Sequence, residues 1–409
     1  MENSWQPGTL KRTPFGVWSL GRAGTVALIA IMSARSAELS LPTSATAPGA
    51  SLLLPVSFAS QSASVAGLQF DLQYDNSVLS LSPTVGDAAR TSGKTLYLWD
   101  LAPGQKRFLI VGLNQDHLED GILVNLFVNL SPTAPAGSHP LRFLNVVGAD
   151  SSAQAVTVGA IDGGINVQGT ASTGSRLQAA GVLNGASLLP GPVAPGEIVT
   201  LIGVGIGPSS PQPPTGSPTS AVLDGTSVLF DGIPAPLLFT APNQVNAIAP
   251  FGIYNSATTE VQVTQQGQAI ADLRLPVAAA APAVFTLDGS GVGQGAILNQ
   301  NSSVNSPDNP AEKGSIITAF ATGAGQTDPP GTDGQIVGDT LPRPLLPVSV
   351  HIAGLEAKVV YAGAAPGMVA GVLQVNCMVP LDSPSGYAVP IILSVGNAPS
   401  PAGVTLAIK

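Results

Sequence analysis

Apolar and polar residues alternate most regularly at residues 67–75, which read GLQFDLQYD. The apolar positions are Leu68, Phe70 and Leu72. The polar positions are Gln69, Asp71 and Gln73. Successive side chains of a strand point to opposite faces, so this period of two predicts a strand with one buried and one solvent-facing side. We expect the three polar side chains to face outward.

Other segments in the first part of the chain follow a similar pattern. They are short apolar or alternating runs at residues 52–58, 78–81, 107–113, 122–130 and 155–167. Glycine and proline interrupt such runs throughout, with 47 and 37 residues, whereas charged residues make up only 10% of the chain. This usage favours strands over long helices. The predicted fold class is therefore all-β, built from sandwiches of two antiparallel sheets packed face to face.

The second half of the chain contains an internal repeat. One copy opens with VAPGEIVTLIGVGIGP from Val193, and the other with NPAEKGSIITAFATGAGQTDP from Asn309. Each copy has a QVN triplet four residues before a proline, at residues 244–246 and 374–376. Each also places a glycine turn between two short strands, at Asp231-Gly232 and Ala353-Gly354, which is a hairpin signal. Two related sandwich lobes are predicted, at 183–285 and 286–409.

Residues 38–168 resemble a cohesin domain. The resemblance rests on the order and spacing of PG at 48–49, LLLPVSF from Leu52, VAGLQFDLQYDNSVLSL from Val65 and AVTVGAIDGGINV from Ala155. It implies a β-sandwich whose partner is a dockerin, a small Ca²⁺-bearing module on polysaccharide-degrading enzymes. It also implies that recognition uses the sheet that holds Gln69. Where better-known cohesins carry Asn and Asp contacts, this chain has Gly67 and Gln69, so adhesion or direct sugar binding stays open.

The C-terminal repeats resemble the IPT/TIG group of immunoglobulin-like domains. The whole region from residue 183 resembles the uncharacterised Solibacter C-terminal domain family. The landmarks are NGASLLPGPVAPGEIVTLIG, PAPLLFTAPNQVNAIAPF, AAPAVFT, NPAEKGSIITAFATGAGQT, LPRPLLPVSV and PSPAGVTLAIK. This resemblance implies a β architecture and no known activity. The small polar residues of GTASTGSRLQAA, from Gly169, predict a linker at 169–182.

The first 37 residues predict a signal peptide. Lys11, Arg12 and Arg22 precede an apolar run at 23–32, and small residues follow it. The run is shorter than the roughly 20 residues that span a bilayer. We expect export with loss of the first 36 or 37 residues, to the outside of the cell or its surface. An uncleaved membrane anchor is the alternative.

Charge and cysteine usage exclude some classes of protein. The formal net charge is −9, which disfavours a nucleic-acid partner because phosphates need clustered Lys and Arg. The single cysteine, Cys377, excludes a disulfide within the chain. Because it stands in the apolar run VLQVNCMVPL, we expect a buried small hydrophobe.

Residues able to carry catalysis are few. The histidines are His117, His139 and His351. They fall in different regions, and no G-x-S-x-G elbow accompanies them. The acids of one loop are Asp116, Glu119 and Asp120. They match no EF-hand pattern and are interpreted as a solvated loop. A separate glycine-rich stretch, GSGVGQGA from Gly289, lacks the Lys-Ser/Thr pair that ends a P-loop, and it predicts a mobile turn. We expect no catalytic residue, metal or cofactor, and no enzyme; a glycoside hydrolase is the weakest alternative.

Tyr97 and Trp99, in KTLYLWDLAPG, are the remaining candidates for recognition. Such rings fill cores, stack on sugars or anchor protein interfaces, and we expect core packing before binding. The leading hypothesis is a secreted, non-catalytic binding or scaffolding protein that recognises a dockerin-type module or a carbohydrate. A purely structural cell-surface or matrix protein is the alternative. The candidate partner-binding residues are Gln69, Asp71, Gln73, Tyr97 and Trp99.

Overall fold

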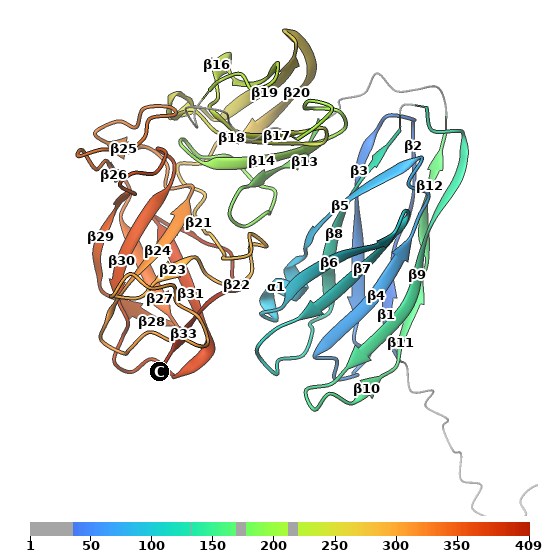
Figure 1. Cartoon of the computed structure of the whole chain (residues 1–409), viewed down its shortest axis with the longest axis horizontal. Helices are drawn as coiled ribbons and strands as arrows, with labels where there is room; N and C mark the ends of the chain where they lie inside the picture. The colour runs from blue at the N-terminus through green and yellow to red at the C-terminus, as the bar shows by residue number, and fades with distance from the viewer. Residues whose placement is uncertain (1–35, 132, 169–176, 212–219) are drawn as a thin grey trace, which may run out of the picture. The chain divides into compact units, whose positions relative to one another are not determined.

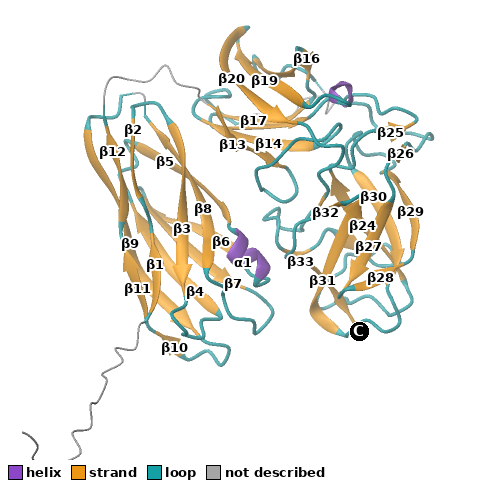
Figure 2. Ribbon diagram, turned by 180° about the vertical axis from the view of Figure 1, so that it is seen from behind, coloured by secondary structure: helices purple, strands orange, loops and turns teal. Residues whose placement is uncertain are grey.

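The computed structural model describes residues 36–131, 133–168, 177–211 and 220–409. The predicted signal peptide lies outside these residues, except for Ser36 and Ala37 at its end. The described chain is almost entirely β, as the sequence predicted, with one short α-helix and one turn of 3₁₀-helix (Figures 1 and 2). No helix in this part of the chain has the length and apolar character to cross a bilayer.

The first module, residues 36–168, is a sandwich of two sheets (Figure 1, blue to green). Its elements are β1 (Ala37–Ser40), β2 (Thr43–Thr46), β3 (Ser51–Ala59), β4 (Gly67–Gln73), β5 (Leu79–Val85), α1 (Asp87–Thr91), β6 (Thr95–Ala102), β7 (Gln105–Val111), β8 (Gly121–Leu130), β9 (Gly137–Ala149), β10 (Ala155–Val156), β11 (Val158–Ile161) and β12 (Gly163–Val167). The sheet orders are β11-β1-β3-β8-β5 and β2-β12-β9-β4-β7-β6, and β10 pairs with β9. The sheets are not purely antiparallel as expected, because β1 pairs with β11 and β2 with β12 in parallel.

Three phenylalanines from adjacent strands form the centre of the first module. Phe70 on β4 stacks on Phe108 of β7, with ring centroids 4.7 Å apart. Phe143 on β9 meets Phe70 edge-on at 5.3 Å. Phe70 and Phe108 are completely buried, as are the neighbouring apolar residues of β4. The alternation at residues 67–75 therefore predicted the inward face of β4 correctly.

The second module, residues 177–276, is a smaller sandwich. Its elements are β13 (Leu177–Asn184), β14 (Ile198–Gly203), β15 (Thr226–Phe230), β16 (Ile233–Pro234), β17 (Leu237–Ala241), β18 (Gln244–Ile248), the 3₁₀ turn η1 (Phe251–Ile253), β19 (Thr258–Gln265) and β20 (Gln268–Pro276). The sheet orders are β13-β14-β18-β17 and β16-β15-β19-β20. Strand β13 starts inside the stretch predicted as a linker, because it pairs with β14; residues 169–176 are not described.

The third module, residues 283–408, completes the chain. Its strands are β21 (Ala283–Val284), β22 (Gly293–Gln294), β23 (Ile297–Leu298), β24 (Ile316–Thr322), β25 (Thr327–Asp328), β26 (Arg343–Pro344), β27 (Val348–Ile352), β28 (Leu355–Ala357), β29 (Val359–Ala364), β30 (Leu373–Met378), β31 (Gly386–Val395), β32 (Ala398–Pro399) and β33 (Val404–Ile408). The main sheets are β21-β24-β30-β29 and β22-β33-β31-β27-β28. Strands β23 and β32 pair with β24 and β31, and β25 pairs with β26.

The internal repeat is visible in matching details of the second and third modules. In each QVN triplet the glutamine amide donates to the asparagine side chain, at 2.9 Å for Gln244–Asn246 and 3.0 Å for Gln374–Asn376. These triplets lie on the equivalent strands β18 and β30. Both predicted hairpin turns have positive φ at their two central residues, the arrangement that suits a two-residue β-turn.

The glycine-rich loop at residues 289–296 differs from its prediction. It was expected to be a mobile turn, but Val292 is fully buried in the core of the first module. Beside it, the buried Arg90 of α1 donates to the carbonyl oxygens of Gly291 and Ser187, each at 2.6 Å. Burial lowers the pKa of Arg90 to about 10, so the guanidinium still carries its charge at neutral pH. Packing and charge-assisted hydrogen bonds hold the loop.

Candidate functional site

The outward side of strands β9, β4, β7 and β6 is the candidate site, and it is called the outer face below. Strand register aligns its side chains in rows. Gln69 pairs with Leu109, which pairs with Tyr97. Asp71 pairs with Arg107, which pairs with Trp99. Directly paired residues project to the same side of a sheet, so the predicted residues of β4 and of β6 belong to one surface, 24 or more positions apart in sequence.

An ion pair lies at the centre of the outer face. The Asp71 carboxylate accepts two hydrogen bonds from Arg107, from Nε at 2.6 Å and from Nη2 at 2.9 Å. Asn145 of β9 donates to the same carboxylate at 2.7 Å. The hydrogen bond from Arg107 lowers the pKa of Asp71 and outweighs the opposing effect of burial. The fork geometry fixes the Arg107 side chain on the sheet.

This arrangement corrects the prediction that Asp71 faces solvent. Its side chain points to the outer face, but it is completely covered, whereas Gln69 is half-buried and Gln73 is exposed. The cover comes from Arg107, whose side chain remains 32% exposed, and from Asn145. A partner would therefore contact Arg107 rather than the carboxylate beneath it. Alternation predicts the face of a side chain, but not what lies above it.

The aromatic pair occupies the edge strand β6 of the outer face. Tyr97 is 43% exposed and Trp99 is 48% exposed, so the expectation that these rings fill the core was wrong. Their centroids are 6.3 Å apart and their planes differ by 22°. Leu96, one position before Tyr97, takes the core side instead. Two large rings standing in solvent, nearly parallel, are typical of a recognition surface rather than of packing.

Sequence reasoning missed several residues of the outer face. They are Leu109 and Arg107 on β7 and Arg142, Asn145 and Val147 on β9. The alternation within residues 107–113 could have placed Arg107 and Leu109 on one face. The contribution of β9 depends on a register shift in its pairing with β4, between Gln69 and Asp71, and on the positive φ of Asn145. No sequence pattern marks that irregularity.

Replacing Asp71 with alanine is expected to lower the free energy of unfolding by about 1–3 kcal/mol, because Arg107 and Asn145 lose their shared acceptor. Urea unfolding of the full chain at neutral pH measures this change. Gln73→Ala is the matched control on the same strand, and as an exposed substitution it should stay within about 0.5 kcal/mol of the wild type. Equal stability of the two variants would contradict the structural role of Asp71.

The other candidate polar groups have structural partners. The Asp120 carboxylate accepts from the Ser60 backbone N–H at 2.7 Å, and a ring nitrogen of His139 lies 2.9 Å from the Pro135 carbonyl. In the described residues no three His, Cys, Asp or Glu side chains converge to hold a metal. Cys377 is fully buried, as expected, and burial raises its pKa to about 12. A thiol in that state is a poor nucleophile at neutral pH.

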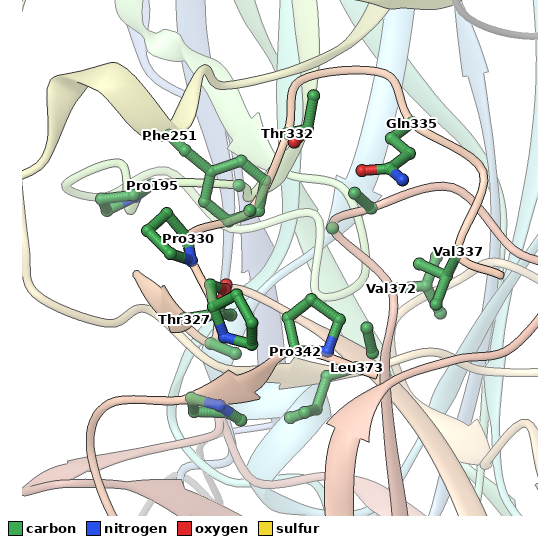
Figure 3. Close-up of a pocket in the computed structure, with 18 of the residues that line it drawn as sticks. Pro195, Phe251, Thr327, Pro330, Thr332, Gln335, Val337, Pro342, Val372 and Leu373 are labelled. Carbon is green, nitrogen blue, oxygen red and sulfur yellow. The ribbon is translucent and has the colours of Figure 1, made fainter. Parts of the chain in front are cut away.

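A pocket of about 260 Å³ lies beside Phe251 in the C-terminal half (Figure 3). Proline, glycine and alanine dominate its lining, with Gln335 and three threonines as the polar side chains. Gly331 packs against the Phe251 ring, which leaves no room for a Cβ atom there. None of the described residues that line this pocket is ionisable. Its described lining therefore offers shape, apolar surface and threonine hydroxyls, but no side chain that would act as a general acid or base.

A buried carboxyl group, Glu197, lies at a second pocket of about 270 Å³. Its two oxygens accept from Asn184 Nδ2 at 2.8 Å and from the Ala194 backbone N–H at 2.7 Å. Burial raises its pKa to about 8, and these hydrogen bonds oppose the rise only in part. Asn184 also donates to the Ala281 carbonyl at 3.0 Å. Hydrogen bonds of Glu197 and Asn184 thus connect three segments of the C-terminal half, at residues 184, 194–197 and 281.

Comparison with known proteins concerns the first module. Residues 37–167 match the family model described as cohesin domain. No curated protein sequence matches the chain. Similar solved structures include the sixth cohesin of scaffoldin B from Acetivibrio cellulolyticus, in complex with a Cel5 dockerin mutant. It is 21% identical, covers 33% of this chain and 100% of its own, and has a TM-score of 0.31.

Two further solved structures are similar over the same module. CaCohA2 from Clostridium acetobutylicum is 22% identical, with coverage of 33% of this chain and 93% of its own and a TM-score of 0.30. A non-cellulosomal cohesin from the archaeon Archaeoglobus fulgidus is 18% identical, with coverage of 33% and 93% and a TM-score of 0.29. The family match concerns the first module and not the whole chain: residues 37–167 form a cohesin domain.

Proposed function

We propose that this chain is an exported, non-catalytic binding or scaffolding protein whose cohesin domain recognises a dockerin-type protein module through the outer face. The observation that carries the proposal is the exposed Tyr97–Trp99 pair beside the fixed Arg107 side chain. Aromatic and arginine side chains supply most of the binding energy at protein interfaces, where flanking contacts exclude water. The outer face presents both on a rigid sheet.

Several residues near the aromatic pair on the outer face favour a protein as the partner. Val147 on the same face is 52% exposed, and Leu101 beyond Trp99 is 45% exposed. Arg142 is exposed and forms no ion pair within the described residues. Exposed apolar side chains together with the charge of Arg142 suit a partner that brings apolar and acidic side chains. The cohesin structure from Acetivibrio cellulolyticus contains a dockerin as its partner.

A carbohydrate is the second candidate ligand. The near-parallel rings of Tyr97 and Trp99 favour it, because sugar rings stack on aromatic faces. The amides of Gln69 and Gln73 on β4, which is separated from β6 by β7, would supply hydrogen bonds to hydroxyl groups. With either ligand, a dockerin module or a carbohydrate, we propose that the protein acts outside the cell, in adhesion or in polysaccharide degradation.

The rest of the chain is proposed to serve as a spacer or a surface attachment. The resemblance of residues 183–409 to the Solibacter C-terminal family, with IPT/TIG-like repeats, stays a prediction, as does cleavage of the signal peptide. A purely structural matrix protein is the alternative role for the whole chain, and it would bind neither ligand. A glycoside hydrolase is not favoured, because the pocket beside Phe251 has no carboxylate in its described lining.

Trp99→Ala is expected to weaken binding of the full chain to a dockerin module by at least about 30-fold, which corresponds to about 2 kcal/mol. Isothermal titration against a panel of purified dockerin modules, with Ca²⁺ present, measures this change. Tyr254→Ala is the matched control, since Tyr254 is a 40% exposed aromatic residue of the second module. Unchanged affinity of the Trp99 variant for a dockerin that binds the wild type would remove the outer face from the interface. A glycan array probed with the same proteins distinguishes a carbohydrate ligand from a dockerin partner, because a carbohydrate ligand would give binding that is lost in Trp99→Ala.

A further inference from the structure

One lysine of the first module is completely buried. Lys94 precedes β6 directly, and none of its surface is exposed. Its Nζ atom has two hydrogen-bond acceptors, both on Asn114, which follows β7. The side-chain Oδ1 lies at 2.5 Å and the backbone carbonyl oxygen at 3.4 Å. An ammonium group carries three donors, so this site suits a neutral amine better than a charged one.

Asn114 is held with its amide nitrogen turned away from the lysine. Its Nδ2 donates to the backbone carbonyls of Ser92 at 3.0 Å and Gly93 at 3.3 Å. These bonds fix the carboxamide with its oxygen, which is bonded directly to Cγ, 2.5 Å from Nζ. Both residues are anchored by the β6–β7 hairpin, in which Thr95 pairs with Val111.

Two glycines make this close approach feasible. A Cβ atom at Gly93, which has a φ of +64°, would lie 2.5 Å from Asn114 Nδ2. A Cβ atom at Gly112 would lie 2.4 Å from the Gly93 carbonyl oxygen and 3.2 Å from Lys94 Cδ. Larger residues at either position would force the lysine and the carboxamide apart. Burial also lowers the pKa of Lys94, although the charge of Asp116 opposes this shift.

We propose that Lys94 and Asn114 form an intramolecular isopeptide bond. The Nζ lone pair attacks the Asn114 carboxamide carbon, the bond from that carbon to Nδ2 breaks, and the departing nitrogen leaves as ammonia after taking a proton from Nζ. One C–N bond replaces another, no electrons are transferred, and no other reactant is needed. The product joins the open ends of β6 and β7, the strands that carry Tyr97, Trp99 and Arg107. A chain with a single cysteine has no disulfide with which to brace this hairpin.

Intact-mass spectrometry of the purified full chain tests the proposal. The wild type should weigh about 17 Da less than its sequence requires, because ammonia is lost. Lys94→Arg and Asn114→Ala should each have the mass of their sequence, and Lys106→Arg, the matched control on β7, should keep the deficit. Comparison between variants cancels any processing at the N-terminus, which all of them share.

A tryptic map of the wild type decides the question even if the variants fail to fold. Trypsin should not cut after Lys94, and residues 91–106 should emerge joined to residues 108–142 as one branched peptide. Separate linear peptides ending at Lys94 and containing an unmodified Asn114, from folded protein of full sequence mass, would overturn the proposal. Loss of about 17 Da located at any other pair of residues would overturn it as well.

Discussion

Raising the pH from about 4.5 to about 8 is expected to lower the free energy of unfolding by as much as about 5 kcal/mol through Glu197 alone, because each pKa unit corresponds to about 1.4 kcal/mol. The carboxyl group is buried, and burial raises its pKa from 4.5 to about 8. The folded state therefore favours the neutral acid, whereas the unfolded chain ionises freely. The stabilisation is complete below pH 4.5, declines as pH rises, and is gone above about pH 8.

Urea unfolding of the full chain at several pH values between 4.5 and 8.5 measures this dependence. Glu197→Gln should remove most of it, because an amide does not ionise in either state. Glu260→Gln serves as the matched control, since the Glu260 side chain is 52% exposed. Asp71 does not interfere, because Arg107 lowers its pKa and it stays ionised throughout this range. A Glu197→Gln chain with the pH dependence of the wild type would refute the assignment.

Phe70→Ala is expected to destabilise the chain by about 3–5 kcal/mol, the usual cost of removing a buried aromatic ring from a packed core. Phe70 is completely buried between Phe108 and Phe143, so its removal leaves a cavity and ends two ring contacts. Chemical denaturation at neutral pH measures the loss.

Leu345→Ala is the control for Phe70→Ala. Leu345 is a 51% exposed apolar residue, so the change in stability should stay within about 0.5 kcal/mol. Phe70 shares β4 with Gln69 and Asp71, and its loss should also weaken binding at the outer face. A Phe70→Ala chain as stable as the Leu345→Ala chain would mean that the three rings do not form the centre of the core.

The sequence predicted the fold class and the face of β4 because both depend on local patterns. Alternation assigned Phe70 to the core and Asp71 to the other side without any knowledge of the neighbouring strands. Whether Asp71 is covered depends on Arg107, 36 positions away, and on a register shift in β9. Tyr97 and Trp99 stay exposed because they project to the outer face beside Leu109 and Arg107. The local run Leu96-Tyr97-Leu98-Trp99 is apolar at every position, so it does not show which side of the strand is buried.

Long-range packing also explains the failure at the glycine-rich loop. Residues 289–296 look mobile when considered alone, because glycine permits many backbone conformations. The loop is held in place by Arg90, whose guanidinium donates a hydrogen bond to the Gly291 carbonyl oxygen, 201 positions away in the sequence. Partners at such separations leave no local signal in either segment.

The burial of Val292 has a consequence for how the protein can be divided. A fragment that ends near residue 168 would lack this side chain, and the apolar core residues that pack against it would be exposed to water. Arg90 would lose both carbonyl acceptors at the same place. Exposed apolar surface promotes self-association, so the excised cohesin domain should aggregate more readily than the intact chain. Here the module boundary in the sequence does not coincide with the boundary of the core.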